Sequence, residues 1–483
     1  MKHHGIIDIG SNSIRLVLYE NQRVLENLKV FAQLRKYLQD DGNLSETGIQ
    51  TLLETLLGFQ KVTRAYGVKE VICAATATIR QSRNQAAICQ KIANETDFHI
   101  RIISEYEEAY FGALAVLNST PLTDGITVDL GGGSTEITLI RNRKVMEYHS
   151  FPFGAVSLAQ QFVGGQLPTA AELAAISTFA RTSFGRFEWL KNCGLPIYAI
   201  GGSARNMARA HQMMTGHLMT GLHAYLMQPH QLQDVQTYLG PLSFEDLQKT
   251  PGIAKERAST IIPSIEVFIA LIAEAASPSF SLSCKGFRNG LILEGRPVLG
   301  LPQIRLESIK EVVDSVPASK SAVALCSELV HLCPAHQELL RYGIALYNSG
   351  RQIDSDESLE HTFYLVTHKT LDGFTQQERA LLALLASYQN RSKFRGYLEQ
   401  FPGWFTKEEQ HEIHAMGAFI KLIHCLRLQG RSLIQSCRVL QKKHQVHLTF
   451  KLKSHQPILE DQAQKQKKHL ERVLKCEILI TFI

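Results

Sequence analysis

Two short apolar runs, each ending near an aspartate and a glycine, open the two halves of the first 300 residues of this chain. Residues 5–9 and 14–19 alternate between apolar and polar with period two, which predicts two paired strands at the start. Apolar residues recur at helical spacing over 47–66, and a short apolar run at 70–75 predicts a buried strand. The pattern over residues 1–118 therefore predicts a mixed α/β domain.

The same scheme is repeated in residues 119–299. We expect a strand at 126–130 with its hairpin partner at 136–140, and a further strand at 197–200 after a long helical stretch. Each half opens with a strand, a glycine-rich turn and a second strand. This repetition indicates a duplicated nucleotide-binding fold with α/β architecture.

From about residue 301 the pattern changes, because glycine turns disappear and helical periodicity dominates. We expect an all-helical domain over 300–432. Residues 433–483 carry alternating apolar runs on either side of a charged helix, which predicts a small α+β domain. The segment from His331 to His336 lacks metal-ligand spacing, so we expect a turn of the helical domain there.

Composition limits the class of protein. A chain of 483 residues is too long for one core, and its 45% apolar and 20% charged residues are typical of soluble globular domains. No apolar run approaches the ~20 residues that span a bilayer, and the early Asp8 argues against a signal peptide. Nine cysteines without a CxxC pair favour reduced thiols in a cytoplasmic protein.

The formal net charge is +6, and much of the excess lies near the end of the chain. A basic balance of this kind would suit a polyanionic substrate. A solvated basic face is the simpler explanation of the same residues. We expect no nucleic-acid partner.

Two glycine-rich turns carry the strongest functional signal. Each follows a strand that ends at an aspartate, Asp8 before the first turn and Asp129 before the second. Glycine lets the backbone bend sharply with its N–H groups toward an anion, although hairpins use the same residues. Two turns of the same form indicate two phosphate grips that face each other across a cleft. The residues expected to contact phosphate are Gly10, Ser11, Asn12 and Ser13 in the first turn, and Gly131, Gly132, Gly133 and Ser134 in the second.

Further side chains supply what phosphoanhydride hydrolysis needs, namely charge neutralisation, a positioned water and a cation. Arg80, on an expected strand-to-helix turn, could clamp a phosphate bidentately. Asp8 and Asp129 are expected to hold Mg²⁺ directly or through water. Glu108 and Glu136 are candidate bases that would orient and deprotonate the water.

Each of these residues also has a purely structural explanation. Ser104 and Glu107 form the pattern of a capping box, so Glu107 and Glu108 would favour a helix start without any catalytic role. Arg80 alone is explained as a surface arginine, and Asp8 alone as a turn former. The functional interpretation gains weight because the candidates fall near the C-terminal ends of strands, where open α/β sheets bind ligands.

Seven stretches of the first 300 residues form a set of motifs in a fixed order: DIGSNSIRLVLY (8–19), ATATIRQSRN (75–84), ISEYEEAYFGAL (103–114), VDLGGGSTEI (128–137), FPFGAVSL (151–158), AIGGSARNMARAH (199–211) and SCKGFRNGLILE (283–294). Together they resemble the exopolyphosphatase and guanosine pentaphosphate phosphohydrolase family, within the actin, hexokinase and Hsp70 superfamily.

The resemblance implies two actin-like, ribonuclease H-like domains, followed by an HD-like helical domain and a small C-terminal domain. It implies that Glu108 is the catalytic glutamate, Asp129 a metal-binding aspartate, Glu136 the acidic residue after the second turn and Arg80 the phosphate-clamping arginine. The implied reaction is Mg²⁺-dependent attack of a water, activated by Glu108, on the terminal phosphorus of a phosphate chain.

The chain departs from the family's pattern at several positions. Tyr347 and Asn348 stand where the family's His-Asp pair would fall, and both are poor metal ligands, while His361 corresponds to another HD position. We therefore interpret the helical domain as metal-free, serving dimerisation or polyanion binding. Asn289 replaces a usual glutamate, and a usual threonine is absent around Ser203, which leaves substrate preference open.

Four functions remain open from the sequence. The main prediction is an exopolyphosphatase acting on inorganic polyphosphate as a cytoplasmic homodimer. The second is the same chemistry on guanosine pentaphosphate, giving the tetraphosphate. The third is a catalytically weak sensor that binds polyphosphate or an alarmone. The fourth is an actin-like chaperone or sugar kinase, which would require an adenosine pocket around Gly201 and Gly202.

Overall fold

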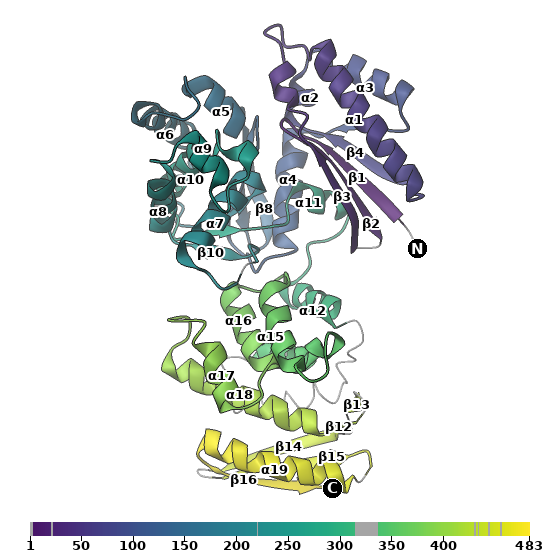
Figure 1. The fold of residues 1–483 in the computed structure, drawn as a ribbon, viewed down its shortest axis with the longest axis vertical. Coiled ribbons are helices and arrows are strands. Elements are labelled where there is room, and N and C mark those ends of the chain that lie inside the picture. Colours follow the sequence, from purple (N-terminus) through teal and green to yellow (C-terminus); the bar gives the residue numbers. More distant parts are fainter. Residues whose placement is uncertain are drawn as a thin grey trace. The chain divides into compact units, whose positions relative to one another are not determined.

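The computed structural model divides the chain into two compact units (Figure 1). The first unit comprises Met1–Gly216 and Ala224–Val298, and the second comprises His217–His223 and Leu299–Ile483. The structure describes residues 3–20, 23–219, 221–313, 337–428, 431–432, 434–442, 445–454 and 456–483. The histidines of the segment 331–336 lie outside the described residues.

The first unit contains two sheets that share an arrangement of five strands, and the second sheet has one further strand at its edge. The strand order is β3-β2-β1-β4-β5 in one sheet and, read from the matching edge, β8-β7-β6-β9-β11-β10 in the other. In each sheet the first three strands along the chain are antiparallel neighbours. Strands β4 and β5 run parallel to β1, and β9 and β11 run parallel to β6, whereas the edge strand β10 is antiparallel to β11. The duplication expected from the sequence is therefore visible in the topology. The strands are β1 (His3–Ile9), β2 (Ile14–Glu20), β3 (Arg23–Val30), β4 (Glu70–Ala75), β5 (Ile100–Ile102), β6 (Gly125–Leu130), β7 (Thr135–Arg141), β8 (Lys144–Phe151), β9 (Ile197–Ile200), β10 (Tyr225–Met227) and β11 (Phe280–Leu282).

Helix α4 (Glu105–Leu117) packs against both sheets. Its N-terminus is closed by a capping box, in which Ser104 Oγ accepts from Glu107 N at 3.2 Å and Glu107 Oε2 accepts from Ser104 N at 2.8 Å. Leu114 belongs to the apolar cluster of the first sheet, and Val116 belongs to a cluster with residues of the second. Burial on both sides fixes this helix, whose first turn carries the glutamates singled out above.

Helix α11 (Phe287–Ile292) crosses α4 in direct backbone contact. A β-carbon on Gly290 would lie 1.8 Å from the carbonyl oxygen of Phe111, so any other residue would force the two helices apart. At the start of α11, Gly286 N donates to Asn289 Oδ1 at 3.2 Å, which is one of the two bonds of a capping box, because glycine has no side chain to form the other. The asparagine that replaces the expected glutamate therefore has a local role at this helix start.

The first unit contains further helices, of which α1 packs on the first sheet. Residues of α1 share one apolar cluster with β1 and β2, on the face opposite to α4. The helix expected at 47–66 corresponds to α1, which is shifted by one residue. These helices are η1 (Leu34–Tyr37), α1 (Glu46–Ala65), α2 (Ala77–Gln81), α3 (Gln85–Glu95), α5 (Ala155–Phe162), α6 (Ala170–Phe184), α7 (Gly201–Thr215), α8 (Pro229–Leu239), α9 (Phe244–Lys249), η2 (Lys255–Arg257) and α10 (Ile261–Ala275).

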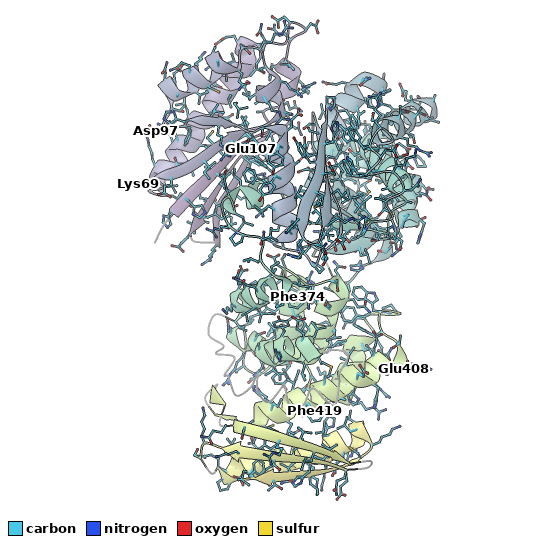
Figure 2. All side chains as sticks on the ribbon, turned by 180° about the vertical axis from the view of Figure 1, so that it is seen from behind. Lys69, Asp97, Glu107, Phe374, Glu408 and Phe419 are labelled. Carbon is cyan, nitrogen blue, oxygen red and sulfur yellow. The ribbon has the colours of Figure 1, made fainter. Side chains whose placement is uncertain are left out.

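The second unit combines a helical part with a three-stranded sheet. Phe374 and Phe419, labelled in Figure 2, belong to its core, and Met219 from the segment His217–His223 is fully buried in the same core. The sheet has the order β14-β15-β16, with one antiparallel and one parallel pairing. The elements are α12 (Leu301–Val312), α14 (Gln337–Leu346), η5 (Ser349–Gln352), α15 (Ser358–His368), α16 (Gln376–Ala386), α17 (Arg391–Leu398), α18 (Lys407–Cys425), β12 (Arg427–Leu428), β13 (Arg431–Ser432), β14 (Ile434–Lys442), β15 (Gln445–Leu452), α19 (Pro457–Leu474) and β16 (Glu477–Phe482).

None of the helices in the described part of the chain combines the length and the apolar character needed to cross a bilayer.

Candidate active site

The two glycine-rich turns are both four-residue hairpin loops. Gly10 N donates to Ser13 O at 3.1 Å in the first turn, and Gly131 N donates to Ser134 O at 3.0 Å in the second. The hairpin that the sequence left open as an alternative is thus the structure of both turns. A hairpin loop of this kind can still present backbone N–H groups to an anion, so the two interpretations are compatible.

The two turns face each other. A β-carbon built on Gly132 would lie 3.4 Å from Ser11 Cβ, and one built on Gly133 would lie 3.1 Å from Ser11 Oγ. The glycines of the second turn therefore approach the serine of the first turn to within side-chain contact. The two turns are therefore close enough for a single ligand to contact both.

Helix α5 holds the second turn through hydrogen bonds to the carbonyl groups of the turn. Two amides at the start of α5 donate to the carbonyls of Gly131 and Gly132, at 2.8 and 3.0 Å. Because C=O and the following N–H of a trans peptide point in opposite directions, the amides of Gly132 and Gly133 point away from α5. Gly154 makes this contact possible, since a β-carbon there would lie 2.6 Å from Gly131 O.

The 3₁₀ helix η1 and the residue before it hold the first turn in a similar way. Arg35 N donates to Ser11 O, and Gln33 N donates to Asn12 O, both at 3.0 Å. By the same argument the amides of Asn12 and Ser13 point away from this support. In each turn two carbonyls therefore accept hydrogen bonds from the supporting helical segment, and the amides that follow them point away from that segment. Amides in this orientation can donate to a phosphate.

Arg80 and Glu108 form an ion pair beside the turns. Arg80 Nη1 donates to Glu108 Oε2 at 2.8 Å and to Ile103 O at 2.9 Å. Arg80 Nε and Nη2 are buried without a hydrogen bond, and Nη2 lies 4.0 Å from Glu105 Oε1. Two guanidinium nitrogens without a hydrogen-bond partner are suited to donate to phosphate oxygens.

Burial raises the pKa of Glu108 to about 7, against the lowering effect of Arg80. The negative charges of Asp129 and Asp8 raise the pKa of Glu108 further. A carboxylate whose pKa lies near neutrality can accept a proton from water during a reaction and release it afterwards. Glu108 therefore has the electrostatics of a general base.

The two aspartates that precede the turns have different surroundings. Arg288 Nη1, on α11, donates to Asp8 Oδ2 at 2.8 Å. Asp129 Oδ1 lies 2.6 Å from the position of a β-carbon on Gly201, and no described residue forms a hydrogen bond or an ion pair with the Asp129 carboxylate. Burial raises the pKa of Asp129 to about 6, although Arg205 lowers it.

Glu136, on β7, is only 4% exposed. Ser150 Oγ donates to Glu136 Oε1 at 2.8 Å. Burial, followed by the charges of Glu108 and Asp129, raises the pKa of Glu136 well above its ordinary value. This shift favours the neutral form of Glu136, so Glu108 is the better placed of the two candidate bases.

Across the described residues, no group of three or more His, Cys, Asp or Glu side chains is placed to hold a metal ion. Mg²⁺ in phosphate-processing enzymes usually takes one or two carboxylates and completes its shell with waters and substrate phosphates. The Asp129 carboxylate has oxygens to which no described residue donates a hydrogen bond, and its pKa is raised. A bound cation would coordinate these oxygens and stabilise the charged form of the carboxylate. Asp8 is less suited to bind a cation, because Arg288 already donates to one of its carboxylate oxygens.

Several arginines near the turns were not singled out from the sequence. Arg205 and Arg288 belong to the motifs AIGGSARNMARAH and SCKGFRNGLILE, so those motifs could have identified them. Arg257 Nη1 donates to Ser203 Oγ at 3.4 Å, and Arg257 Nη2 lies 2.6 Å from the position of a β-carbon on Gly202. Arg257 therefore covers the glycine around which an adenosine pocket would have to form.

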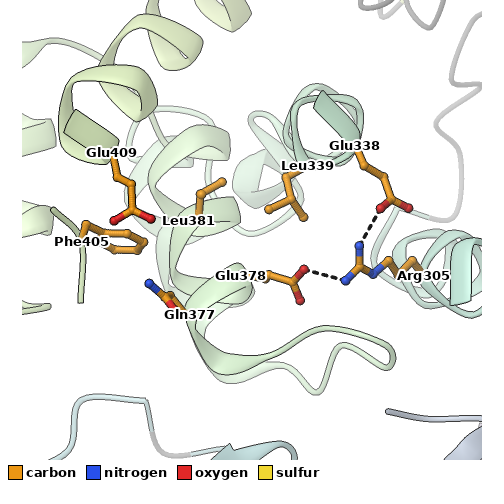
Figure 3. A pocket seen from close by; sticks show the side chains of 8 residues that line it. All are labelled: Arg305, Glu338, Leu339, Gln377, Glu378, Leu381, Phe405 and Glu409. Carbon is orange, nitrogen blue, oxygen red and sulfur yellow. Dashed lines mark hydrogen bonds and ion pairs between the residues drawn. The ribbon is translucent and has the colours of Figure 1, made fainter. Parts of the chain in front are cut away.

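The second unit has a pocket of about 270 Å³ that contains none of the predicted site residues (Figure 3). Arg305 is held there by Glu338 at 2.7 Å and by Glu378 at 2.6 Å, and its side chain is only 7% exposed. The guanidinium is thus satisfied within the protein, and the pocket lies beside a structural ion-pair network. Its lining residues are Arg305, Glu338, Leu339, Gln377, Glu378, Leu381, Phe405 and Glu409.

Comparison with known proteins identifies the family. Residues 7–297 match the Ppx/GppA phosphatase family, and residues 319–471 match the Ppx/GppA phosphatase domain III. Because the first match alone spans more than half of the sequence, the chain belongs to the Ppx/GppA phosphatase family. The resemblance drawn from the seven motifs is thereby confirmed.

Two relatives illustrate the range of the family. The chain is 24% identical over 442 residues to a guanosine-5'-triphosphate,3'-diphosphate pyrophosphatase of Photobacterium profundum, covering 88% of this chain and 85% of that protein. It is 25% identical over 307 residues to a bifunctional 3-dehydroquinate synthase/phosphatase of Fusobacterium nucleatum, covering 60% of this chain but 46% of that protein.

Solved structures share the fold. A Ppx/GppA family member of Aquifex aeolicus superposes with a TM-score of 0.53 at 23% identity, covering 60% of this chain and 96% of that one. An exopolyphosphatase from Cytophaga hutchinsonii superposes with a TM-score of 0.55 at 18% identity, covering 62% and 100%. The mixed α/β fold predicted for the first 300 residues agrees with these likenesses.

Proposed function

We propose that this chain is an exopolyphosphatase, which removes terminal phosphates from inorganic polyphosphate with the help of Mg²⁺. The observation that carries the proposal is the position of Glu108, whose pKa of about 7 and bond to Arg80 suit a base beside a phosphate site. Membership of the phosphatase family supports hydrolysis of a phosphoanhydride as the class of reaction.

In the proposed reaction the backbone amides of the two turns bind oxygens of the phosphate chain. Arg80 binds the terminal phosphate through its unfilled donors. Glu108 accepts a proton as the water oxygen bonds to the terminal phosphorus, and the bond from that phosphorus to the bridging oxygen breaks. Mg²⁺, when bound, neutralises charge on the phosphate oxygens; Asp129 would hold it, with Asp8 and Glu136 as further oxygen donors.

The alternative substrate is guanosine pentaphosphate, hydrolysed to the tetraphosphate by the same attack on a terminal phosphorus. It is favoured by the relative from Photobacterium profundum, which matches over 85% of its own length and is named for action on that nucleotide. The turns, Arg80 and Glu108 would serve either substrate, because both present a terminal phosphoanhydride. Substrate competition therefore has to separate the two.

For the second unit we propose an HD-like helical part without a metal, which serves dimerisation or polyanion binding in the cytoplasm. Tyr347, at the position of the family's His-Asp pair, donates its hydroxyl to the carbonyl of Tyr388 at 3.0 Å, which is a packing role. Part of the basic charge of α19 is already paired, since Lys465 binds Asp461 and Lys467 lies 3.6 Å from Glu471. The remaining lysines would act on a long polyanion more than on a short one.

The test measures phosphate release with Mg²⁺ from long-chain polyphosphate and from guanosine pentaphosphate, side by side, for the wild type and Glu108→Gln. Faster release from polyphosphate, lost in the variant, would support the exopolyphosphatase. Faster release from the nucleotide would assign the chain to the alternative substrate. Release from neither would favour a sensor that binds these compounds without turnover.

A further inference from the structure

Arg35 lies where the two phosphate turns meet. Its backbone N–H donates to Ser11 O at 3.0 Å, which fixes the residue against the first turn. A β-carbon built on Gly133 would lie 3.9 Å from Arg35 Nη1, so the guanidinium also reaches the second turn. The side chain of Arg35 therefore extends from one turn to the other.

Gln81 fixes the direction of this side chain. Arg35 Nη1 donates to Gln81 Oε1 at 2.6 Å. Gln81 directly follows Arg80 at the end of α2, so adjacent residues of one short helix orient Arg35 and bind Glu108. Because the amide of Gln81 is neutral, it orients the Arg35 guanidinium without neutralising its charge.

Arg35 also differs from its neighbours in its charge balance. Within the described ranges no carboxylate lies at ion-pair distance from Arg35, whereas Arg80 and Arg288 each bind a glutamate or an aspartate. The side chain of Arg35 is half-buried, and no neighbouring carboxylate of the described residues neutralises its charge. A bound anion between the turns would supply the missing counter-ion.

We infer that Arg35 is a further substrate-binding residue, which donates to a non-bridging oxygen of a condensed phosphate held between the two turns. The inference rests on the proposed function for the identity of the substrate, but the binding itself depends only on the contacts of Arg35. A guanidinium oriented in advance loses little freedom when it binds phosphate oxygens, and its charge-assisted bonds are among the strongest in proteins.

The chain offers a matched control one residue away. Lys36, in the same 3₁₀ helix, is exposed, and its Nζ donates to Gln33 Oε1 at 2.8 Å. Arg35→Gln and Lys36→Gln each remove one positive charge from the same helical turn. A general electrostatic effect of the region would change both variants alike, whereas direct binding would change the first alone.

The experiment measures calorimetrically the binding of inorganic tripolyphosphate with Mg²⁺, with each variant made in the Glu108→Gln background to prevent turnover. Arg35→Gln should weaken binding on the order of 10- to 100-fold, and Lys36→Gln by less than about twofold. Arg35→Lys should recover part of the loss, because it keeps the charge without the planar fork. Equal effects of Arg35→Gln and Lys36→Gln would overturn the inference.

Gln81→Leu provides a second route if Arg35→Gln fails to fold. It leaves Arg35 in place but removes its orienting acceptor, and should weaken tripolyphosphate binding by roughly 3- to 10-fold. Unchanged binding in this variant would argue against a preset guanidinium. Phosphate release by the wild type and by the variants that keep Glu108 separates this inference from the proposed function. If tripolyphosphate binding depends on Arg35 but neither polyphosphate nor guanosine pentaphosphate is hydrolysed, the proposed function fails and this inference stands.

Discussion

The two phosphate turns share one backbone design but differ in the role of their aspartates. Both are four-residue hairpin loops closed by the same kind of hydrogen bond, and each is held by its carbonyls from a neighbouring helical segment. Asp8, before the first turn, is bound by Arg288 at 2.8 Å, whereas the Asp129 carboxylate has no ion-pair partner in the described part of the chain. Equal loop geometry therefore does not imply equal chemistry.

The difference assigns separate tasks to the two turns. The Asp8–Arg288 pair joins β1 to α11, the helix that crosses α4 at Gly290, so the first aspartate contributes to holding the site together. Asp129 keeps its oxygens unfilled at a raised pKa of about 6, and we therefore propose it as the main ligand of the cation. The predictions that follow test this division of tasks, from the largest expected effect to the smallest.

Glu108→Gln should produce the largest loss, because it removes the side chain that we propose as the base. We expect phosphate release to fall roughly 10²- to 10⁴-fold, while tripolyphosphate binding, measured without Mg²⁺ to prevent turnover, stays within about threefold of wild type. Glutamine preserves the size of the side chain and an oxygen that can accept from Arg80, so the phosphate site should persist. Release assays and calorimetry measure the two quantities, and near wild-type turnover would exclude Glu108 as the base.

Asp129→Asn and Asp8→Asn test the comparison directly. Asp129→Asn should raise the half-saturating Mg²⁺ concentration by more than about 10-fold, because it removes the unpaired carboxylate. Asp8→Asn should change that concentration little, but should lower the free energy of unfolding by ~1 kcal/mol through the loss of the ion pair with Arg288. Mg²⁺ titration of activity and urea unfolding provide the measurements. A larger Mg²⁺ effect for Asp8→Asn would reverse the assignment.

Gly154→Ala should disturb the second turn alone. The added β-carbon would lie 2.6 Å from Gly131 O, and overpacking of this kind should lower the free energy of unfolding by ~1–3 kcal/mol. Displacement of the turn should also reduce phosphate release. Gly164→Ala is the control, because its nearest neighbour, Glu172 Oε1, would be at 3.5 Å. Identical denaturation curves for the two variants would show that the second turn does not depend on this close approach.

The pH dependence should give the smallest effect. Because the pKa of Glu108 is about 7 and the base must be deprotonated, kcat/KM should rise with pH and level off above about pH 7. Asp8→Asn should move this rise to lower pH, since the charge of Asp8 raises the pKa of Glu108. A rise that stays in place in Asp8→Asn would show that the first aspartate does not act on the base electrostatically.

The same shift makes a prediction for stability. The folded protein binds the proton of Glu108 more tightly than the unfolded chain, whose glutamates titrate near 4.5. The stability contributed by this group is therefore fully present below pH 4.5 and is lost as pH rises through about 7. Urea unfolding without Mg²⁺ should show this contribution in wild type, and Glu108→Gln should remove it.

Local signals predicted the parts of the structure that depend on neighbouring residues. Period-two strands, the glycine turns and the Ser104 capping box were all visible in the sequence, because each is decided within a few positions. The Asp8–Arg288 pair joins residues that lie far apart in the sequence, so no local pattern of residues indicates it. Arg35 lies between motifs, and its place beside both turns depends on how η1 docks on the first hairpin.

The segment His217–His223 has a consequence for how the chain is made. It is translated before residue 299, yet it belongs to the second unit, where Met219 is fully buried and Gln376 Nε2 donates to Gly221 O at 2.8 Å. During synthesis this apolar segment leaves the ribosome well before its packing partners exist. A fragment ending at Val298 would lack the residues that bury Met219, so we expect this segment to stay exposed in such a fragment.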